Sequence, residues 1–198
     1  MKLCGRARLL WYFGAAAYLT VVIARCGQTA PERVSLLDLS GRHVEPLGTS
    51  RAKATVFLFI RSDCPISNRY APEVKRLYEN FAPRGVRFWL VYPDPSEEAS
   101  SIPKHLAQYN SPFGALRDPG HALVRLTGVT ITPEAAVFVG GGKLVYHGRI
   151  DDLYVDIGKE RRAPTTHDLA DVLEAILEGK AVTHASAPAV GCFISDLN

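Results

Sequence analysis

The chain has 198 residues, of which 47% are apolar and 22% are charged, and its formal net charge is +3. This length and composition fit one globular domain with accessory segments. The small net charge and the lack of any block of lysine and arginine argue against a nucleic-acid-binding surface.

Residues 1–30 are predicted to be a signal peptide or an N-terminal membrane anchor. A basic start precedes the uncharged, mostly apolar run Leu9–Ala24, and this order is that of a secretory signal. The run is shorter than the ~20 residues that cross a bilayer comfortably, and Arg25 ends it without a clean cleavage pattern. A cleaved signal and an uncleaved anchor both stay open, and the alternative is a helix buried in the fold. We expect a periplasmic, secreted or membrane-anchored domain, with residues 9–24 as the anchor.

The four cysteines divide into two groups. Cys4 lies in the basic start and Cys26 follows the apolar run, so both are expected to lie outside the folded domain. Cys64 and Cys192 remain for the domain itself. Export would place them in an oxidising compartment, where a disulfide can persist, but the sequence alone does not determine whether they pair.

The first half of the domain is predicted to begin with a hairpin around Ser40-Gly41, followed by a strand, a helix and a second strand. These elements are expected at Val34–Leu39, Gly41–Leu47, Thr55–Ile60, Pro65 to about Phe81, and Val86–Tyr92. The two apolar strands are typical of the buried part of a parallel sheet.

The second half is predicted to alternate in the same way and to end in a long helix. The expected elements are a helix from Ser96 to about Tyr109, a short strand at Gly114–Arg117, a helix from the Asp118 turn through Thr127, strands at Val129–Thr132, Ala135–Val139 and Leu144–Ile150, a polar loop at Asp151–Ala163, and a helix from Thr165 or Thr166 to Gly179. A glycine-rich turn, Gly140–Lys143, joins two of these strands as a hairpin. The pattern indicates an α/β domain over residues 31–180, with a mixed sheet covered by helices on both faces, and an irregular C-terminal tail over 181–198 that carries Cys192.

Cys64 lies where the first buried strand gives way to a helix, and Pro65 suits the first helical position. Free N–H groups and the helix dipole stabilise a thiolate there, although Asp63 opposes this effect. We expect a reactive thiol in an accessible pocket, and the alternative is a buried structural cysteine. Ser67, one helical turn later, can donate a hydrogen bond to the thiolate or can be an inert polar residue.

Three motifs in order resemble the thioredoxin superfamily. Cys64-Pro65-Ile66-Ser67 matches the Cys-x-x-Cys segment, Ala71-Pro72 matches a pair in the following helix, and Thr132-Pro133 before Phe138 matches the proline, usually cis, that precedes a strand. Over about residues 34–180 the chain is similar to the redoxin branch, which includes TlpA-like oxidoreductases and AhpC/TSA peroxiredoxins. The resemblance implies a thioredoxin-like sheet and a cis Pro133 that faces Cys64 and offers backbone groups to a substrate strand.

The chain departs from these families at two places. Ser67 replaces the second cysteine, so no disulfide can form within the motif. The peroxiredoxin pattern Pro-x-x-x-Thr-x-x-Cys is also absent, because Phe57 and Arg61 occupy the proline and threonine positions. The lack of the activating threonine weakens a peroxidase assignment.

The preferred function is that of an exported thiol-disulfide oxidoreductase acting on a protein thiol or disulfide. The Cys64 thiolate would attack a disulfide sulfur to give a mixed disulfide, which a second thiol must resolve. Cys192 is the candidate for that thiol, and its alternative role is that of a buried apolar cysteine beside Phe193 and Ile194. If the tail cannot reach, a small thiol or a partner's cysteine would resolve the adduct. This scheme uses no cofactor and no metal.

Two other functions compete with this one. A peroxiredoxin-like thiol peroxidase would form a sulfenic acid that condenses with Cys192, and it needs a cation beside the thiolate. The candidates for this cation are Arg61, Arg69, Arg117 and Arg149, each of which is more typical of a solvated surface. A Sco-like metal carrier would have to combine Cys64 with His121, His147 or His167, which is a poor ligand set.

Overall fold

The computed structural model describes residues 34–48, 51–140 and 142–197. The predicted signal or anchor segment, with Cys4 and Cys26, lies outside the described residues. Among the residues that are described, none of the helices combines the length and the apolar character needed to cross a membrane.

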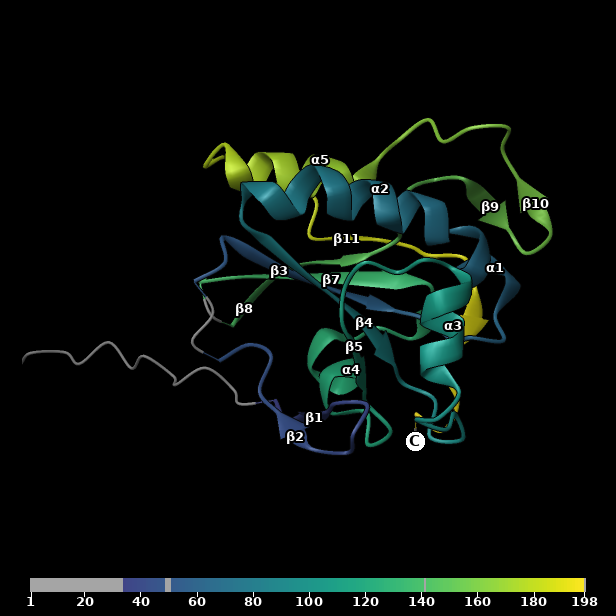
Figure 1. Ribbon diagram of the computed structural model, residues 1–198. Coiled ribbons are helices and arrows are strands. Elements are labelled where there is room, and N and C mark those ends of the chain that lie inside the picture. Colours follow the sequence, from purple (N-terminus) through teal and green to yellow (C-terminus); the bar gives the residue numbers. More distant parts are fainter. Residues whose placement is uncertain (1–33, 49–50, 141, 198) are drawn as a thin grey trace, which may run out of the picture. The chain divides into compact units, whose positions relative to one another are not determined.

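A mixed sheet of eight strands forms the centre of the domain, in the order β11-β8-β7-β3-β4-β5-β1-β2 (Figure 1). Its strands are β1 (Leu36–Leu37), β2 (His43–Val44), β3 (Ala54–Phe59), β4 (Val86–Tyr92), β5 (Ala115–Arg117), β7 (Glu134–Val139), β8 (Lys143–Gly148) and β11 (Ser186–Ala187). Strand β3 runs parallel to β4 and antiparallel to β7. The predicted mixed sheet and the hairpin at the start of the domain are therefore confirmed.

Strand β3 lies in the middle of the sheet, and all six of its residues are buried. Alternate side chains point to opposite faces, so Val56 and Leu58 join one hydrophobic core while Phe57 and Phe59 join the other. This burial on both faces explains why the sequence of β3 is a continuous apolar run.

Helices cover both faces of the sheet (Figure 1). They are α1 (Pro65–Arg69), α2 (Ala71–Phe81), α3 (Ile102–Gln108), α4 (Ala122–Thr127) and α5 (Asp168–Leu177), with a short 3-10 helix, η1 (Ala82–Arg84), after α2. Helices α2, α3 and α5 contribute to the core that contains Val56, whereas α4 packs into the core that contains Phe57. The predicted covering of both faces is confirmed.

The helix predicted from Pro65 to Phe81 is divided at Tyr70 into α1 and α2. Pro72 lies in the first turn of α2, where its missing N–H costs no hydrogen bond. The division sets α1 apart as a separate turn of helix that begins directly after Cys64.

Helix α4 begins at a buried carboxylate. Asp118 accepts hydrogen bonds from the N–H groups of Ala122, Leu123 and Val124 at 2.8, 2.9 and 3.0 Å. We expect Asp118→Ala to lower the free energy of unfolding by about 2 kcal/mol, because it leaves two buried N–H groups and one partly buried N–H group without this partner. Urea denaturation measures the effect, with Asp156→Ala on an exposed strand as the control. Equal stability of the two variants would contradict this role of Asp118.

Two predictions of local structure are wrong. The helix expected from Ser96 begins only at Ile102, because the N–H and hydroxyl of Ser96 both donate to the Asp94 carboxylate and form a turn instead. The polar loop expected over 151–163 contains a small hairpin made of β9 (Tyr154–Asp156) and β10 (Lys159–Glu160).

The tail after Gly179 is more regular than expected. Strand β11 extends the main sheet by pairing in parallel with β8. A second strand, β12 (Cys192–Phe193), pairs with β6 (Ile131–Thr132) in a separate sheet of two strands. Both pairings join segments that are distant in the sequence, and the pattern of the tail alone gives no sign of them.

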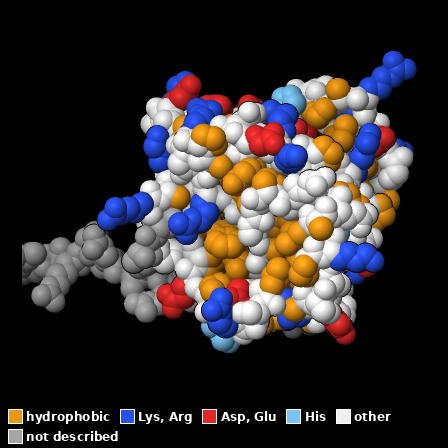
Figure 2. All heavy atoms as spheres, in the orientation of Figure 1, with side chains coloured by type: hydrophobic (Ala, Val, Ile, Leu, Met, Phe, Trp, Pro, Cys, Tyr) orange, Lys and Arg blue, Asp and Glu red, His pale blue; other side chains and the backbone are white. Residues whose placement is uncertain are grey.

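One face of the domain is apolar at its centre. Figure 2 shows apolar side chains gathered in the middle of the view, over the region where Figure 1 shows β4 and β5, while most charged side chains lie toward the edges. The rings of Tyr78, Phe88 and Phe113 pack against one another in the core that contains Val56.

Candidate active site

Cys64 is placed by the junction of β3 and α1. It is the N-cap residue of α1, and its sulfur accepts a hydrogen bond from the N–H of Ser67 at 3.5 Å. Pro65 follows in the first turn. This is the local arrangement that the strand-Cys-Pro-helix pattern predicts, and it directs backbone N–H dipoles toward the sulfur.

The tail brings Cys192 to the same place. In the antiparallel pairing of β12 with β6, Cys192 lies opposite Thr132, and its sulfur is 2.7 Å from the sulfur of Cys64. Both residues are free cysteines, since a disulfide requires about 2.05 Å between the sulfurs. The two predicted redox residues, 128 positions apart in the sequence, are thus in direct contact.

Pro133 lies immediately beyond this contact. The Thr132–Pro133 peptide bond is cis, as predicted, and the Cys64 thiol donates to the Thr132 carbonyl at 3.4 Å. The backbone edge that was expected to receive a substrate strand is occupied by the chain's own β12.

Close backbone contacts hold β12 on β6. The Ile194 N–H donates to the Thr130 carbonyl at 3.0 Å, and the Thr132 hydroxyl donates to the Cys192 carbonyl at 3.3 Å. A Cβ atom at Gly191 would lie only 2.0 Å from the Thr132 oxygen, so this approach requires glycine. The Ile194 side chain is buried in the core beside α4, whereas Phe193 is 73% exposed.

The expectation of an accessible Cys64 thiol is wrong for this arrangement. Cys64 is only 1% exposed, and the Cys192 sulfur lies directly against it. Cys192 itself is partly exposed. In this arrangement the strand that carries Cys192 therefore covers the Cys64 sulfur.

The two thiols differ in acidity. Burial raises the pKa of Cys64, but hydrogen bonding from Cys192 and from the side chain and N–H of Ser67 lowers it by more, so the pKa lies below its usual value. Burial, together with the Cys64 thiolate next to it, raises the pKa of Cys192 to about 11. The first thiolate of the pair therefore forms on Cys64.

Arg61 is the sequence-predicted cation that lies beside this pair. Its guanidinium donates to both carboxylate oxygens of Asp63 at 3.0 and 2.9 Å, forms an ion pair with Asp94 at 3.1 Å, and donates to the Phe193 carbonyl at 3.4 Å. It acts electrostatically on Cys192. The sequence marks Arg61 only as one cation among several, because Asp94 and Phe193 are distant along the chain.

The other candidate cations have partners elsewhere. Arg69 pairs with Glu160 at 4.0 Å, Arg117 donates to the Glu97 carbonyl, and Arg149 forms an ion pair with Asp168.

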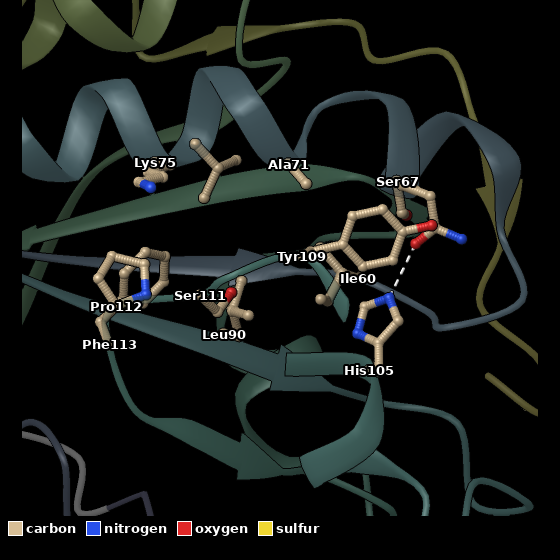
Figure 3. Close-up of a pocket in the computed structure, with 12 residues that line it drawn as sticks. Ile60, Ser67, Ala71, Lys75, Leu90, His105, Tyr109, Ser111, Pro112 and Phe113 are labelled. Atoms are coloured by element: carbon tan, nitrogen blue, oxygen red, sulfur yellow. Dashed lines mark hydrogen bonds between the residues drawn. The ribbon is translucent and has the colours of Figure 1, made fainter. Parts of the chain in front are cut away.

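Ser67 borders a narrow pocket between α1, α2 and the α3 loop (Figure 3). The Ser67 hydroxyl is buried and near enough to the Cys64 sulfur to lower its pKa, but it makes no hydrogen bond of standard geometry with the described residues. It can therefore turn toward the Cys64 sulfur, as predicted for a donor to the thiolate. The pocket has about 20 Å³ of internal free volume, which is room for about one water molecule.

Asn68 and His105, which sequence reasoning did not identify, form the polar end of this pocket. The dashed line in Figure 3 marks the 2.8 Å bond between them. Since the Asn68 amide nitrogen donates to the Ser62 carbonyl, its oxygen must accept from His105 Nε2, and Nδ1 accepts from the Tyr92 hydroxyl at 2.8 Å. Burial lowers the pKa of His105, in keeping with a neutral ring. The chain of bonds fixes α1 and the segment before Cys64.

The histidines named as possible metal ligands do not lie with Cys64. His121 Nε2 contacts the Pro93 carbonyl, and His147 pairs with Glu134. Within residues 34–48, 51–140 and 142–197, the group of potential ligands that come together is Glu73, Asp151 and His167, which does not include Cys64.

Comparisons with solved structures place this geometry in a known fold. A hypothetical protein from Sinorhizobium meliloti 1021 is 24% identical, with a TM-score of 0.70 over 85% of this chain and 94% of that one. An uncharacterized conserved protein from Geobacillus kaustophilus is 26% identical, with a TM-score of 0.70 over 82% and 87%. A secreted Mycobacterium tuberculosis disulfide oxidoreductase is 17% identical, with a TM-score of 0.50 over 74% and 96%. The predicted thioredoxin-like fold is confirmed.

No curated protein matches the sequence. A match to a protein family is nevertheless clear: residues 26–147 fit the AhpC/TSA family. This segment contains β3, Cys64, α1 and the cis Thr132–Pro133 bond, which are the features that carry the resemblance to redoxins. The chain belongs to the AhpC/TSA family, in the redoxin branch of the thioredoxin-like proteins.

Proposed function

We propose that this protein is an exported thiol-disulfide oxidoreductase in which Cys64 is the nucleophile and Cys192 resolves the mixed disulfide. The observation that carries this proposal is the 2.7 Å contact between the two sulfurs beside Pro133. The lowered pKa of Cys64 and the raised pKa of Cys192 support the same division of roles.

The reaction proceeds in two exchanges. The Cys64 thiolate attacks one sulfur of a substrate disulfide, the substrate S–S bond breaks, and the other substrate sulfur leaves as a thiolate that takes up a proton. Cys192 then loses its proton and attacks the Cys64 sulfur, which releases the second substrate thiolate and forms the Cys64–Cys192 disulfide. The substrate gains two electrons, and a thiol reductant must restore the two cysteines for another turnover.

Movement of the tail precedes the first exchange. Cys64 is covered while β12 lies on β6, and that strand is held by a few hydrogen bonds, one of them from Arg61, and by the Ile194 side chain. Short segments with few buried contacts open at low free-energy cost. A protein substrate that presents an extended strand would then pair with the freed edge of β6 for the first exchange, and it must leave that edge before β12 returns with Cys192 for the second.

Export is part of the proposal and rests on the basic and apolar character of residues 1–30. The Mycobacterium tuberculosis neighbour is a secreted disulfide oxidoreductase, which supports the same location for this chain. The proposed catalytic domain comprises residues 31–180, and the tail over 181–198 supplies Cys192.

A peroxiredoxin-like activity is the second candidate, because the AhpC/TSA family match favours it. Cys64 would attack a peroxide oxygen, release an alcohol or water, and become a sulfenic acid that condenses with Cys192 with loss of water. Arg61 in place of the peroxiredoxin threonine argues against efficient peroxide cleavage.

One experiment separates the two activities. Reduced protein is mixed with glutathione disulfide or with hydrogen peroxide, and mass spectrometry follows the Cys64–Cys192 linkage. We expect glutathione disulfide to produce the linkage through a glutathione adduct on Cys64, and Cys64→Ser to reduce adduct formation by at least ~100-fold. Rapid linkage with peroxide alone would favour the peroxidase, and no linkage with either oxidant would contradict the proposal.

A further inference from the structure

We propose that Arg61 is the positioning residue for the resolving cysteine: its guanidinium holds the Phe193 carbonyl and so keeps the strand that carries Cys192 against Cys64. This inference rests on the proposed function, because it assigns the group that makes the second exchange fast. Arg61 touches neither sulfur through a hydrogen bond, so its role is to place the tail.

The guanidinium is itself held rigidly. Asp63 binds it through two parallel hydrogen bonds, the strong geometry for arginine and a carboxylate. Asp94, two residues after the end of β4, adds an ion pair and is only 5% exposed. Carboxylates in the segments that follow β3 and β4 therefore fix Arg61, which leaves Nη1 to donate to the Phe193 carbonyl at 3.4 Å.

Strand β12 needs a contact of this kind to stay in place on β6. Strand β12 is two residues long, and the side chain of Phe193 is 73% exposed, so it contributes little burial. Ile194 anchors the strand on one side of Cys192, and the Thr132 hydroxyl binds the Cys192 carbonyl. Arg61 binds the carbonyl between these two anchors, at the residue directly after Cys192.

The positive charge of Arg61 also favours the attack of Cys192 on the mixed disulfide at Cys64. Cys192 must lose a proton before it attacks, and the arginine lowers the pKa that burial and Cys64 raise. Asp63 acts in the opposite direction, and its pairing with Arg61 brings the two opposing charges together. Arg61 occupies the position at which the peroxiredoxin pattern has threonine. In this chain the residue at that position binds the C-terminal tail instead.

The test uses full-length protein with Arg61→Ala, Arg61→Lys and a matched control, Arg84→Ala. Arg84 also binds a carboxylate, that of Glu174, through two hydrogen bonds. It precedes β4, whereas Asp94, the partner of Arg61, follows β4, so Arg84 lies at the opposite end of that strand. We expect Arg61→Ala to slow formation of the Cys64–Cys192 disulfide by glutathione disulfide about tenfold and to move its pH dependence upward. Arg61→Lys keeps the positive charge but lacks the planar set of donors of a guanidinium. Compared with Arg61→Ala, it should therefore recover the wild-type pH dependence but not the wild-type rate. Arg84→Ala should behave like the wild type in both respects.

A second readout does not depend on redox chemistry. In a Cys192→Ser background, adding Arg61→Ala should speed alkylation of Cys64 by iodoacetamide about tenfold, because the tail is released more often. Unchanged alkylation and an unchanged rate of bridging would overturn the role of Arg61. A wild-type protein that never forms the bridge would contradict the proposed function, while faster alkylation in the Arg61 variant would still support its hold on the strand.

Discussion

Gly191→Ala is expected to reduce the rate of Cys64–Cys192 disulfide formation by about 100-fold, with little effect on the fold of the domain. An added Cβ would lie 2.0 Å from the Thr132 oxygen and 2.7 Å from its carbonyl carbon. Both are backbone atoms and cannot rotate away, so the tail strand must move instead. Loss of two or three strand hydrogen bonds, each contributing about 1 kcal/mol, accounts for a change of this size.

Three measurements follow from this expectation. Mass spectrometry after addition of glutathione disulfide gives the rate of bridging, iodoacetamide alkylation gives the exposure of Cys64, and urea denaturation gives the stability. In the Gly191→Ala variant, bridging should slow while alkylation of Cys64 accelerates. Gly120→Ala is the matched control, because a Cβ there meets no atom within 4 Å. Fast bridging in both variants would show that the close approach of Gly191 to Thr132 is not needed.

The parts of the fold and of the site that depend on neighbouring residues in the sequence could be predicted. The apolar run before Cys64, the proline after it and the glycine that ends α4 each act within one turn or strand. The strand Val86–Tyr92 has the predicted bounds because its alternate residues from Val86 to Tyr92 are buried in one core and Val91 in the other, so that Arg87 is its one exposed position. The cis bond at Pro133 was predicted from the family resemblance and not from local chemistry.

The parts that depend on distant residues could not be predicted. The burial of Cys64 follows from the pairing of β12 with β6, and a short tail strand has no periodicity that would indicate its partner. Gly191 before Cys192 is the one local signal of a close backbone approach, and its meaning depends on Thr132. In the same way, Asp94 binds Ser96, which keeps the predicted helix from beginning there, and it also binds Arg61. Only the fold brings Asp94 and Arg61 together.

Loss of the Cys192 thiol is expected to leave the glutathione adduct on Cys64 unresolved, with resolution slower by at least ~1000-fold. In the wild type the attacking sulfur already lies 2.7 Å from Cys64, and well-placed intramolecular groups act at effective concentrations far above ~1 M. In the variant, a dissolved thiol at about 1 mM must take over this step. Mass spectrometry of the adduct over time measures the rate.

A pair of variants separates resolution from thiolate stabilisation. Cys192→Ser and Cys192→Ala both remove the resolving sulfur, so both should accumulate the adduct. Only the serine hydroxyl can still donate a hydrogen bond to the Cys64 thiolate, so the pKa of Cys64 should rise more in the alanine variant, and the ultraviolet absorbance of the thiolate reports it. Because folding lowers the pKa of Cys64, the thiolate stabilises the fold above the unfolded-state pKa, and this contribution is lost as the pH falls through the folded-state pKa. The alanine variant should lose part of this alkaline stabilisation in urea denaturation. Rapid clearance of the adduct in both variants would mean that another thiol resolves it.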